Sequence, residues 1–386
     1  MTNARLPVAL VVVATMTGVA TSACSSSDPR GHPSSQVAIP DSTSTSITSG
    51  TRQGPTTLRL HRTVVAHGIR SPWGLAFLPN GKALVSTRDP GNILLVNPRG
   101  GKRLVKHLAG VASNGAQGGE AGLLGLAVSP RFRTNHWVYA YMSAANDNRI
   151  VRMRWRHGHL GPPHVIISGI PRGLHHNGGR IAFGPDGMLY ATTGESGVPS
   201  LAQQRSSLGG KILRMTPAGR PAPGNPFRNS VVYTLGHRNV EGLDWDRKGR
   251  LWATEFGEHA WDELNLIRPG RNYGWPIVEG MSSGHRFTNP KAVWRTDSAG
   301  PSGIAIRPGR RGSVAWIGAL TGERLYRVRL HGNTVVGRRF FLEGRLGRIR
   351  TAEISAHGRL WITTSNTDGR ATPRPADDKI IRITVR

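Results

Sequence analysis

Hydrophobic residues along this chain occur in short runs separated by glycine, proline, asparagine or aspartate. Examples are residues 83–87, 93–96, 137–141 and 360–364, which are rich in β-branched and aromatic side chains. Runs of this length and composition predict β-strands. We find no long segment after residue 56 with the hydrophobic spacing of an amphipathic helix. The pattern therefore predicts an all-β domain.

A hairpin-like motif occurs six times, with two hydrophobic segments on either side of a proline, aspartate or glycine turn. The copies start 48 to 62 residues apart, at Leu75, Leu126, Ile181, Leu243, Ile304 and Ala352. Each interval has room for four strands and their loops. Strand-only repeats of this size predict a six-bladed β-propeller. Two stacked β-sandwiches, the alternative, would not require the same hairpin six times.

The N-terminus has the composition of a targeting segment. An apolar stretch at 6–20 is too short to cross a bilayer comfortably, and three small residues separate it from Cys24, the single cysteine of the chain. Residues 1–23 thus resemble the signal peptide of a bacterial lipoprotein, with Cys24 as the site of lipidation. Thr21 departs from this pattern, because leucine is more usual there. An ordinary secretory signal is the alternative.

Residues 24–56 are rich in serine, threonine, glycine and proline and contain few large apolar groups. Such a segment cannot bury enough surface to fold, so we expect a flexible tether followed by a folded domain at 57–386. We therefore expect an extracytoplasmic protein, either a membrane-anchored lipoprotein of the cell surface or a secreted one.

The chain carries 51 Lys and Arg against 22 Asp and Glu, a formal charge of +29. A charge of this sign favours nucleic acid or an anionic membrane as a partner. The cationic residues are nevertheless scattered singly over every segment, without a basic helix or a long basic run. We therefore do not expect a nucleic-acid partner.

Polar residues recur just before the first strand of several repeats. Propeller loops of one phase surround the same end of the central channel, so we expect these residues to meet there. They are Glu120, His176, Arg238, Asn239, Arg348 and Arg350. A second set follows the second strand of a hairpin, at 193–197, 254–258 and 364–366, and by the same argument faces the same opening.

These residue types indicate acid–base chemistry on an anionic ligand. His176 is the candidate general base and Glu195 its candidate carboxylate partner, because such a pair works near neutral pH. The arginines, for which the sequence shows no evident acidic partner, indicate carboxylates or phosphates. No glycine-rich phosphate loop precedes a helix, which argues against a nucleotide. Backbone carbonyls at Gly257 and Glu258 would suit Ca²⁺.

From about Ser71 to the C-terminus, the chain resembles the soluble quinoprotein glucose dehydrogenases and the related aldose sugar dehydrogenases. The motifs that carry the resemblance, besides the His176 loop, are Gly118-Gly119-Glu120-Ala121-Gly122-Leu123-Leu124-Gly125, Tyr233-Thr234-Leu235-Gly236-His237-Arg238-Asn239, Asp262-Glu263-Leu264-Asn265-Leu266-Ile267 and Asn272-Tyr273-Gly274-Trp275-Pro276. The resemblance implies a six-bladed propeller that uses pyrroloquinoline quinone (PQQ) and Ca²⁺ to oxidise aldoses to lactones. It also implies a respiratory electron acceptor as a partner.

The resemblance assigns roles by position. His176 corresponds to the base that takes the sugar hydroxyl proton while hydride leaves C1 for the quinone, with Glu195 orienting it and Glu120 beside cofactor and substrate. Arg238 belongs to the same catalytic group. The implied cofactor contacts are Arg238, Asn239, Glu241, Arg348 and Arg350. The implied metal ligands are Gly257 and Glu258 for the active-site Ca²⁺, and Glu263 and Tyr273 for a structural Ca²⁺.

Three positions depart from the family pattern. Thr321 stands where the glucose enzymes have a cofactor-binding lysine, Thr351 where an aspartate is common, and His175 where the glucose enzymes have an aspartate. Two other functions therefore stay open. One is a propeller that binds a ligand without catalysis, and the other is a Ca²⁺-dependent propeller lactonase or other hydrolase.

Overall fold

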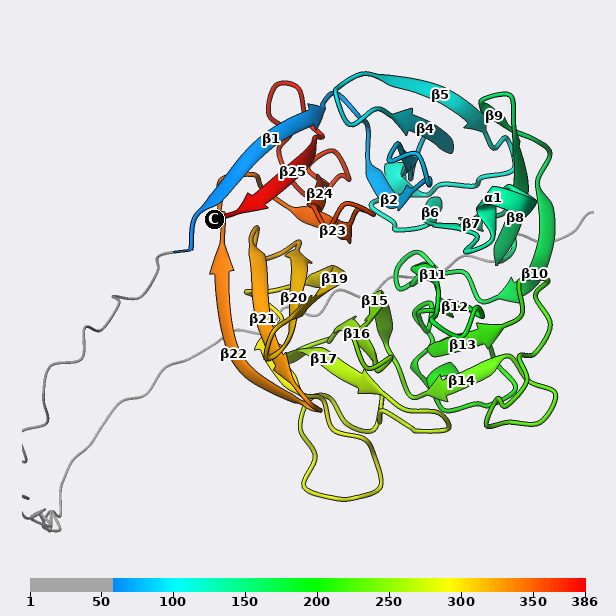
Figure 1. Cartoon of the computed structure of the whole chain (residues 1–386). Helices are drawn as coiled ribbons and strands as arrows, with labels where there is room; N and C mark the ends of the chain where they lie inside the picture. The colour runs from blue at the N-terminus through cyan, green and yellow to red at the C-terminus, as the bar shows by residue number, and fades with distance from the viewer. Residues whose placement is uncertain (1–57) are drawn as a thin grey trace, which may run out of the picture. The chain divides into compact units, whose positions relative to one another are not determined.

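The computed structural model describes residues 58–386, which form six antiparallel sheets arranged as blades around a central axis (Figure 1). The predicted all-β, six-bladed propeller is confirmed. The predicted signal peptide, Cys24 and the whole predicted tether lie outside the described residues. Within residues 58–386, no helix has the length and apolar character needed to cross a membrane.

The strands follow one another blade by blade. Blade 1 contains β2 (Pro72–Phe77), β3 (Ala83–Thr87), β4 (Asn92–Val96) and β5 (Lys102–His107). Blade 2 contains β6 (Leu123–Val128), β7 (Trp137–Ser143), β8 (Asn148–Arg156), the short β9 (His159–Leu160) and β10 (His164–Ile170). Blade 3 contains β11 (Ile181–Phe183), β12 (Leu189–Thr192), β13 (Lys211–Met215) and β14 (Val232–Leu235).

Blade 4 contains β15 (Asn239–Trp245), β16 (Leu251–Phe256), β17 (Trp261–Ile267) and β18 (Ala292–Arg295). Blade 5 contains β19 (Pro301–Gly309), β20 (Gly312–Ala319), β21 (Leu325–His331) and β22 (Thr334–Phe341). Blade 6 contains β23 (Ile349–Ile354), β24 (Leu360–Thr364), β25 (Ile380–Val385) and β1 (Leu60–Ala66). Three single-turn helices interrupt the loops, η1 (Gly115–Gln117), α1 (Phe132–Asn135) and η2 (Pro199–Ala202).

All six predicted hairpins form the first two strands of a blade. The register pairs Leu75 with Val85 in blade 1 and Ile181 with Ala191 in blade 3. The first strand of every blade therefore starts at the same end of the propeller, which we call the mouth. The hairpin turns lie at the other end, which we call the opposite face.

Burial differs between inner and outer strands because each blade packs face to face with its neighbours. The second strands β3, β12 and β24 are buried along their whole length, so both of their faces are apolar. The outermost strand β22 has mostly exposed side chains. Between blades, Phe77 meets Trp361 edge to face with ring centroids 5.2 Å apart. The core thus lies between the blades.

The hairpin pattern did not predict how the ring closes. The first described strand, β1, pairs with β25, so that Leu60 lies opposite Val385 and the last blade is built from both ends of the domain. This pairing covers a sheet edge and ties the two ends together. The Arg59 N–H also donates to the Arg386 carbonyl at 2.8 Å, on the opposite face.

Candidate active site

The loop between β10 and β11 brings His176 to the mouth with a backbone φ of 55°. Histidine adopts this left-handed region less readily than glycine, so the surrounding contacts must hold it there. Gly178 follows with φ of 61°, and a Cβ at this position would approach the Thr193 backbone to 2.6 Å. The loop is therefore pressed against the end of β12, which carries the next functional residue.

That residue is Glu195, which is 1 % exposed. Its Oε1 is hydrogen-bonded to Nδ1 of His176. Within the described residues, Nε2 of His176 has no hydrogen-bond partner. When the carboxylate accepts a hydrogen bond from Nδ1–H, Nε2 carries no proton, and its lone pair can accept one from a substrate. The structure thus brings together the two residues that the sequence paired.

Glu120 holds the backbone of His176. Its Oε2 accepts the His176 N–H at 2.8 Å, and its Oε1 accepts from Nη1 of Arg370 at 2.9 Å. Arg370 also donates to the Gly118 carbonyl at 3.1 Å and lies 3.2 Å from Nδ1 of His175. Burial alone would raise the pKa of Glu120, but Arg370 and His176 outweigh it and lower the pKa. Glu120 is therefore a carboxylate that positions the candidate base.

The loop before β15 braces this arrangement from blade 4. Oδ1 of Asn239 accepts the Gly178 N–H at 2.9 Å, and the Arg238 carbonyl accepts the Glu195 N–H at 2.9 Å. The Arg238 N–H in turn donates to Oε1 of Glu255 at 2.5 Å. Neighbouring blades are thus joined through the main chain around the candidate base.

A buried histidine supports the other oxygen of Glu255. His237 is 0 % exposed, and its Nδ1 lies 2.8 Å from Oε2 of Glu255 while its Nε2 lies 2.9 Å from Oγ1 of Thr234. Its ring stacks on Tyr273 with centroids 4.6 Å apart. His237 and Glu255 therefore fix the backbone at Arg238 from behind.

The side chain of Arg238 meets the acidic loop after β16. Its Nη1 donates to the Gly257 carbonyl at 2.6 Å, and its Nε lies 3.5 Å from Oε2 of Glu258. The guanidinium also lies 5.4 Å from the ring centroid of Trp275. The structure thus brings the two predicted Ca²⁺ ligands next to a predicted cofactor contact.

The sequence suggested that the arginines have no acidic partners, and this prediction is wrong. Oδ2 of Asp368 accepts from Arg348 at 3.1 Å and lies 3.4 Å from Nη2 of Arg350. Nη1 of Arg350 donates to Oε2 of Glu241 at 2.6 Å, which Ser302 also contacts at 2.6 Å. Burial would raise the pKa of Asp368, but the two arginines lower it. Glu241 is thus a counter-ion of Arg350, and its predicted contact with the cofactor stays a prediction.

Glu263 lies inside blade 4. Its Oε1 accepts the Gly280 N–H at 2.7 Å and its Oε2 accepts from Nδ2 of Asn265 at 2.8 Å. Burial and the nearby Glu255 raise its pKa to about 8. A buried carboxylate beside a second one is a position that a cation would stabilise.

Tyr273 can offer only its main chain to a metal. Its hydroxyl donates to the Leu266 carbonyl at 2.7 Å and accepts the Arg268 N–H at 3.0 Å. The phenol hydroxyl therefore forms hydrogen bonds with the backbone of blade 4. If Tyr273 is a ligand, as the resemblance implies, the donor must be its carbonyl oxygen.

The donors in blade 4 fit a hard cation in chemical type. A cavity of about 10 Å³, the space of about one water molecule, lies among Glu255, Gly257, Glu263, Tyr273 and Glu279. Oδ1 of Asn265 is buried beside it without a hydrogen-bond partner. Carboxylate, amide and carbonyl oxygens are the donors that Ca²⁺ prefers. No group of three or more His, Cys, Asp or Glu side chains in residues 58–386 is arranged to hold a metal, so main-chain carbonyls would have to complete a site.

The mouth also fits an anionic quinone. Several N–H donors at the mouth are buried and have no hydrogen-bond partner in the described part of the chain, among them Arg238 Nε, Asn239 Nδ2, Trp275 Nε1 and Arg350 Nε. A buried donor without a partner is costly, and an acceptor-rich ligand would relieve that cost. Carboxylate and quinone oxygens are such acceptors.

Three functional positions were missed by the sequence reasoning. Asp368 and Arg370 lie on the loop after β24, and His237 lies immediately before Arg238. Asp368 follows the second strand of its blade, as Glu195 does, and Glu255 lies near the end of the second strand of blade 4. This shared phase was the signal available. Arg370 had no such signal, because its partner Glu120 is 250 residues away in the chain.

Comparisons with known proteins agree with this geometry. The family model described as Glucose / Sorbosone dehydrogenase matches residues 69–375. The structure of a PQQ-bound form of aldose sugar dehydrogenase from Streptomyces coelicolor is similar, with 50 % identity, a TM-score of 0.81, and coverage of 86 % of this chain and 99 % of that one.

Two sequence relatives have the same character. The quinoprotein glucose dehydrogenase B of Acinetobacter calcoaceticus is 32 % identical over 266 residues, which are 60 % of this chain and 55 % of that protein. The aldose sugar dehydrogenase YliI of Escherichia coli (strain K12) is 27 % identical over 338 residues, 78 % of this chain and 90 % of that protein. With the family model covering most of the propeller, the chain belongs to the glucose/sorbosone dehydrogenase family, whose members similar to it are quinoprotein oxidoreductases.

Proposed function

We propose that this chain oxidises aldose sugars to lactones with PQQ and Ca²⁺, and that His176 is the base. The observation that carries the proposal is the His176–Glu195 pair, held by Glu120 at a mouth that also contains three arginines. The PQQ-bound structural relative and the quinoprotein relative support the choice of cofactor.

The cofactor, when bound, would supply the acceptor for the hydride that leaves C1 of the sugar. Nε2 of His176 would accept the proton of the C1 hydroxyl, so that one hydride and one proton leave the sugar and the lactone forms. Glu195 would hold the imidazole and stabilise its positive charge after protonation. Glu120 would keep the histidine backbone in its left-handed conformation.

The arginines would bind and orient the cofactor. Arg238, Arg348 and Arg350 come from two blades, and the guanidinium fork suits carboxylate groups. Asp368 and Glu241 would hold Arg348 and Arg350 in place before the cofactor arrives, so little ordering of these two side chains is needed on binding. Gly257 and Glu258 would hold the active-site Ca²⁺, with Glu263 and the Tyr273 carbonyl at a structural Ca²⁺.

We also propose an extracytoplasmic location with Cys24 as the acylated residue, and a respiratory acceptor for the electrons. The motif before Cys24 supports the location. Labelling with a palmitate analogue in the native host tests it, since a Cys24→Ser variant should not incorporate the label.

Reconstitution of the apoprotein with PQQ and Ca²⁺ tests the activity, followed by dye reduction over a panel of aldoses. His176→Gln should lower kcat by about 10³-fold while quinone absorbance still reports binding, because a positioned base contributes 10² to 10⁴-fold. His175→Gln is the matched control and should lose less than about ten-fold. Quinone binding without sugar oxidation would favour the ligand-binding propeller. Full activity in His176→Gln would refute the assigned base.

A further inference from the structure

The face opposite the mouth carries exposed cations with no partner. Seven of them lie in the hairpin turns of blades 2, 4, 5 and 6: Arg131, Arg133, Arg247, Lys248, Arg310, Arg311 and Arg359. All seven are exposed, and within residues 58–386 none of these side chains makes a hydrogen bond or an ion pair. We call this surface the basic face.

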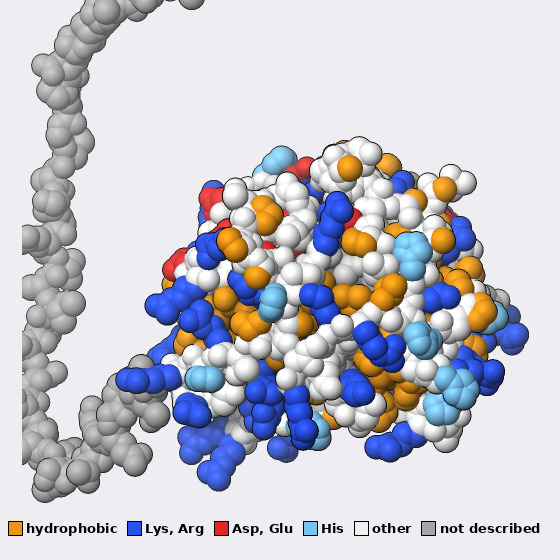
Figure 2. Space-filling model, turned by 90° about the horizontal axis from the view of Figure 1, so that it is seen from above, with side chains coloured by type: hydrophobic (Ala, Val, Ile, Leu, Met, Phe, Trp, Pro, Cys, Tyr) orange, Lys and Arg blue, Asp and Glu red, His pale blue; other side chains and the backbone are white. Residues whose placement is uncertain are grey.

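Carboxylates are distributed in the opposite way. Only four acidic residues of residues 58–386 are exposed, and three of them, Glu258, Asp297 and Glu343, lie toward the mouth. The fourth, Asp186, lies on the basic face and is paired with Arg214 at 2.9 Å. Figure 2 shows Lys and Arg gathered toward one edge of the molecule and Asp and Glu toward the other. An arginine-rich composition alone would not separate the two signs of charge.

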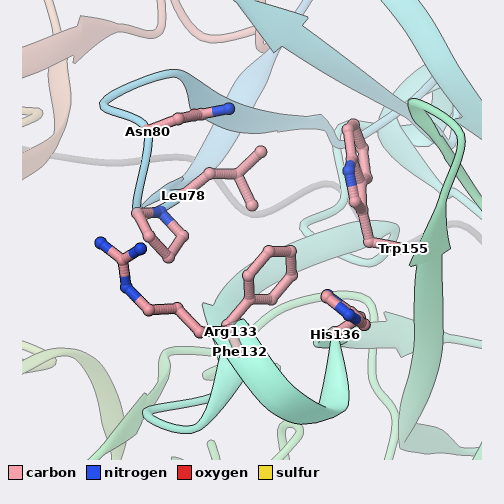
Figure 3. Close-up of a pocket in the computed structure, with 7 residues that line it drawn as sticks. Leu78, Asn80, Phe132, Arg133, His136 and Trp155 are labelled. Carbon is pink, nitrogen blue, oxygen red and sulfur yellow. The ribbon is translucent and has the colours of Figure 1, made fainter.

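A hollow opens on the basic face between the first two blades. It has a volume of about 330 Å³ and is bounded by the turn at Leu78, by Phe132 in α1 and by the ring of Trp155 (Figure 3). Arg133 and His136 stand at its side (Figure 3). An aromatic ring and an apolar floor with an arginine at the rim form an arrangement found at membrane interfaces.

The chain enters the domain on this same face. β1 runs from the basic face toward the mouth, and its first residues pair with the end of β25. The first described residues, 58 and 59, therefore lie on the basic face, which is the attachment point of the preceding segment.

The charge of the basic face, its hollow and the point where the chain enters the domain all favour the same partner. We infer that the basic face docks on an anionic lipid bilayer, with Trp155 and its hollow at the interface and the mouth directed away from the membrane. Each lysine or arginine near an anionic surface strengthens binding about five-fold, and the effect fades within a Debye length of about 10 Å. Cations of the basic face therefore contribute to the affinity for the membrane, and cations of the mouth do not.

The test uses the full chain with Cys24→Ser, so that acylation contributes nothing. Co-sedimentation is measured with vesicles of phosphatidylcholine, with and without about 30 mol % phosphatidylglycerol, at about 0.1 M NaCl. The triple variant Arg133→Gln, Arg247→Gln, Arg310→Gln should bind the anionic vesicles at least about ten-fold more weakly.

The matched control removes the same charge near the mouth, by Arg70→Gln, Arg295→Gln and Arg345→Gln. It should lose less than about two-fold, and the shared N-terminal segment cancels in the comparison. Equal losses in both triples would overturn the inference, as would equal binding to neutral vesicles. Retention on duplex DNA with no binding to anionic vesicles would also overturn it.

Brominated lipids test the position of the hollow. They should quench tryptophan fluorescence of the bound protein, and Trp155→Phe should remove part of that quenching. Unchanged quenching in the variant would place the hollow outside the interface.

Discussion

Arginines of the mouth and arginines of the basic face share a side chain but differ in environment. Arg348 and Arg350 are buried, and each is bonded to a carboxylate. Arg247 and Arg310 are exposed on hairpin turns. The same cation therefore serves a preorganised binding site in one place and a long-range surface potential in the other. Placement, and not the net charge of +29, separates the two functions.

The largest expected effect comes from removing the counter-ion of the mouth. Asp368→Asn leaves Arg348 buried without a carboxylate and Arg350 with Glu241 alone, so we expect about 3 kcal/mol less free energy of unfolding. Urea denaturation measures this loss. Asp297→Asn, which removes the exposed partner of Arg295 at 3.7 Å, is the matched control and should change stability by less than about 0.5 kcal/mol. Equal losses would erase the contrast between buried and exposed pairs.

A second effect is the pH dependence of stability that follows from Glu353, a residue of the first strand of blade 6. Burial and the neighbouring Asp244 raise the pKa of Glu353 to about 8, and Arg180 offsets this only in part. The folded pKa lies above the unfolded one, so stability is full below about pH 4.5 and is lost as the pH rises through 8.

Glu353 is partly exposed, so solvent screening reduces the effect of this shift on stability. Glu353→Gln should therefore be as stable as the unmodified chain at pH 4 and about 2 kcal/mol more stable at pH 9. Thermal melts at several pH values measure the difference. A difference that stays constant with pH would show that the carboxylate does not titrate as described.

A smaller effect is expected at the contact between blade 6 and the base. Arg370→Gln removes the cation that lowers the pKa of Glu120 and loosens the His176 backbone, so we expect kcat to fall about ten-fold. Because the pKa of Glu120 rises in the variant, the acid limb of the pH profile should move to higher pH. Arg345→Gln, an exposed neighbour, should leave both the rate and the profile unchanged. A lower kcat with an unshifted pH profile would mean that Arg370 only holds the loop in place and does not affect the pKa of Glu120.

The smallest effect should come from the basic face itself. The triple variant Arg133→Gln, Arg247→Gln, Arg310→Gln breaks no hydrogen bond, so the free energy of unfolding should change by less than about 0.5 kcal/mol per substitution. Dye reduction should be unchanged as well. Loss of stability there would show that these cations support the fold and would remove the contrast with the mouth.

The sequence by itself determined the fold and half of the site. Strand-length hydrophobic runs and six hairpins at near-equal spacing specify a six-bladed propeller, because local alternation and turn chemistry are written in neighbouring residues. The same repeat phase placed His176, Glu195, Arg238 and Arg348 at one mouth. The position of a residue within its repeat can be read from the sequence, so these residues could be placed at the mouth without the structure.

Only the tertiary structure decided the partners of those residues. The ring closure of β1 on β25, the sharing of Asp368 by two arginines and the contact of Arg370 with Glu120 all join segments that are distant in sequence. Ion pairs of this kind depend on which loops meet at the axis, and no local pattern encodes that meeting. The separation of exposed carboxylates from exposed arginines likewise appears only when the turns of all six blades are brought to one face.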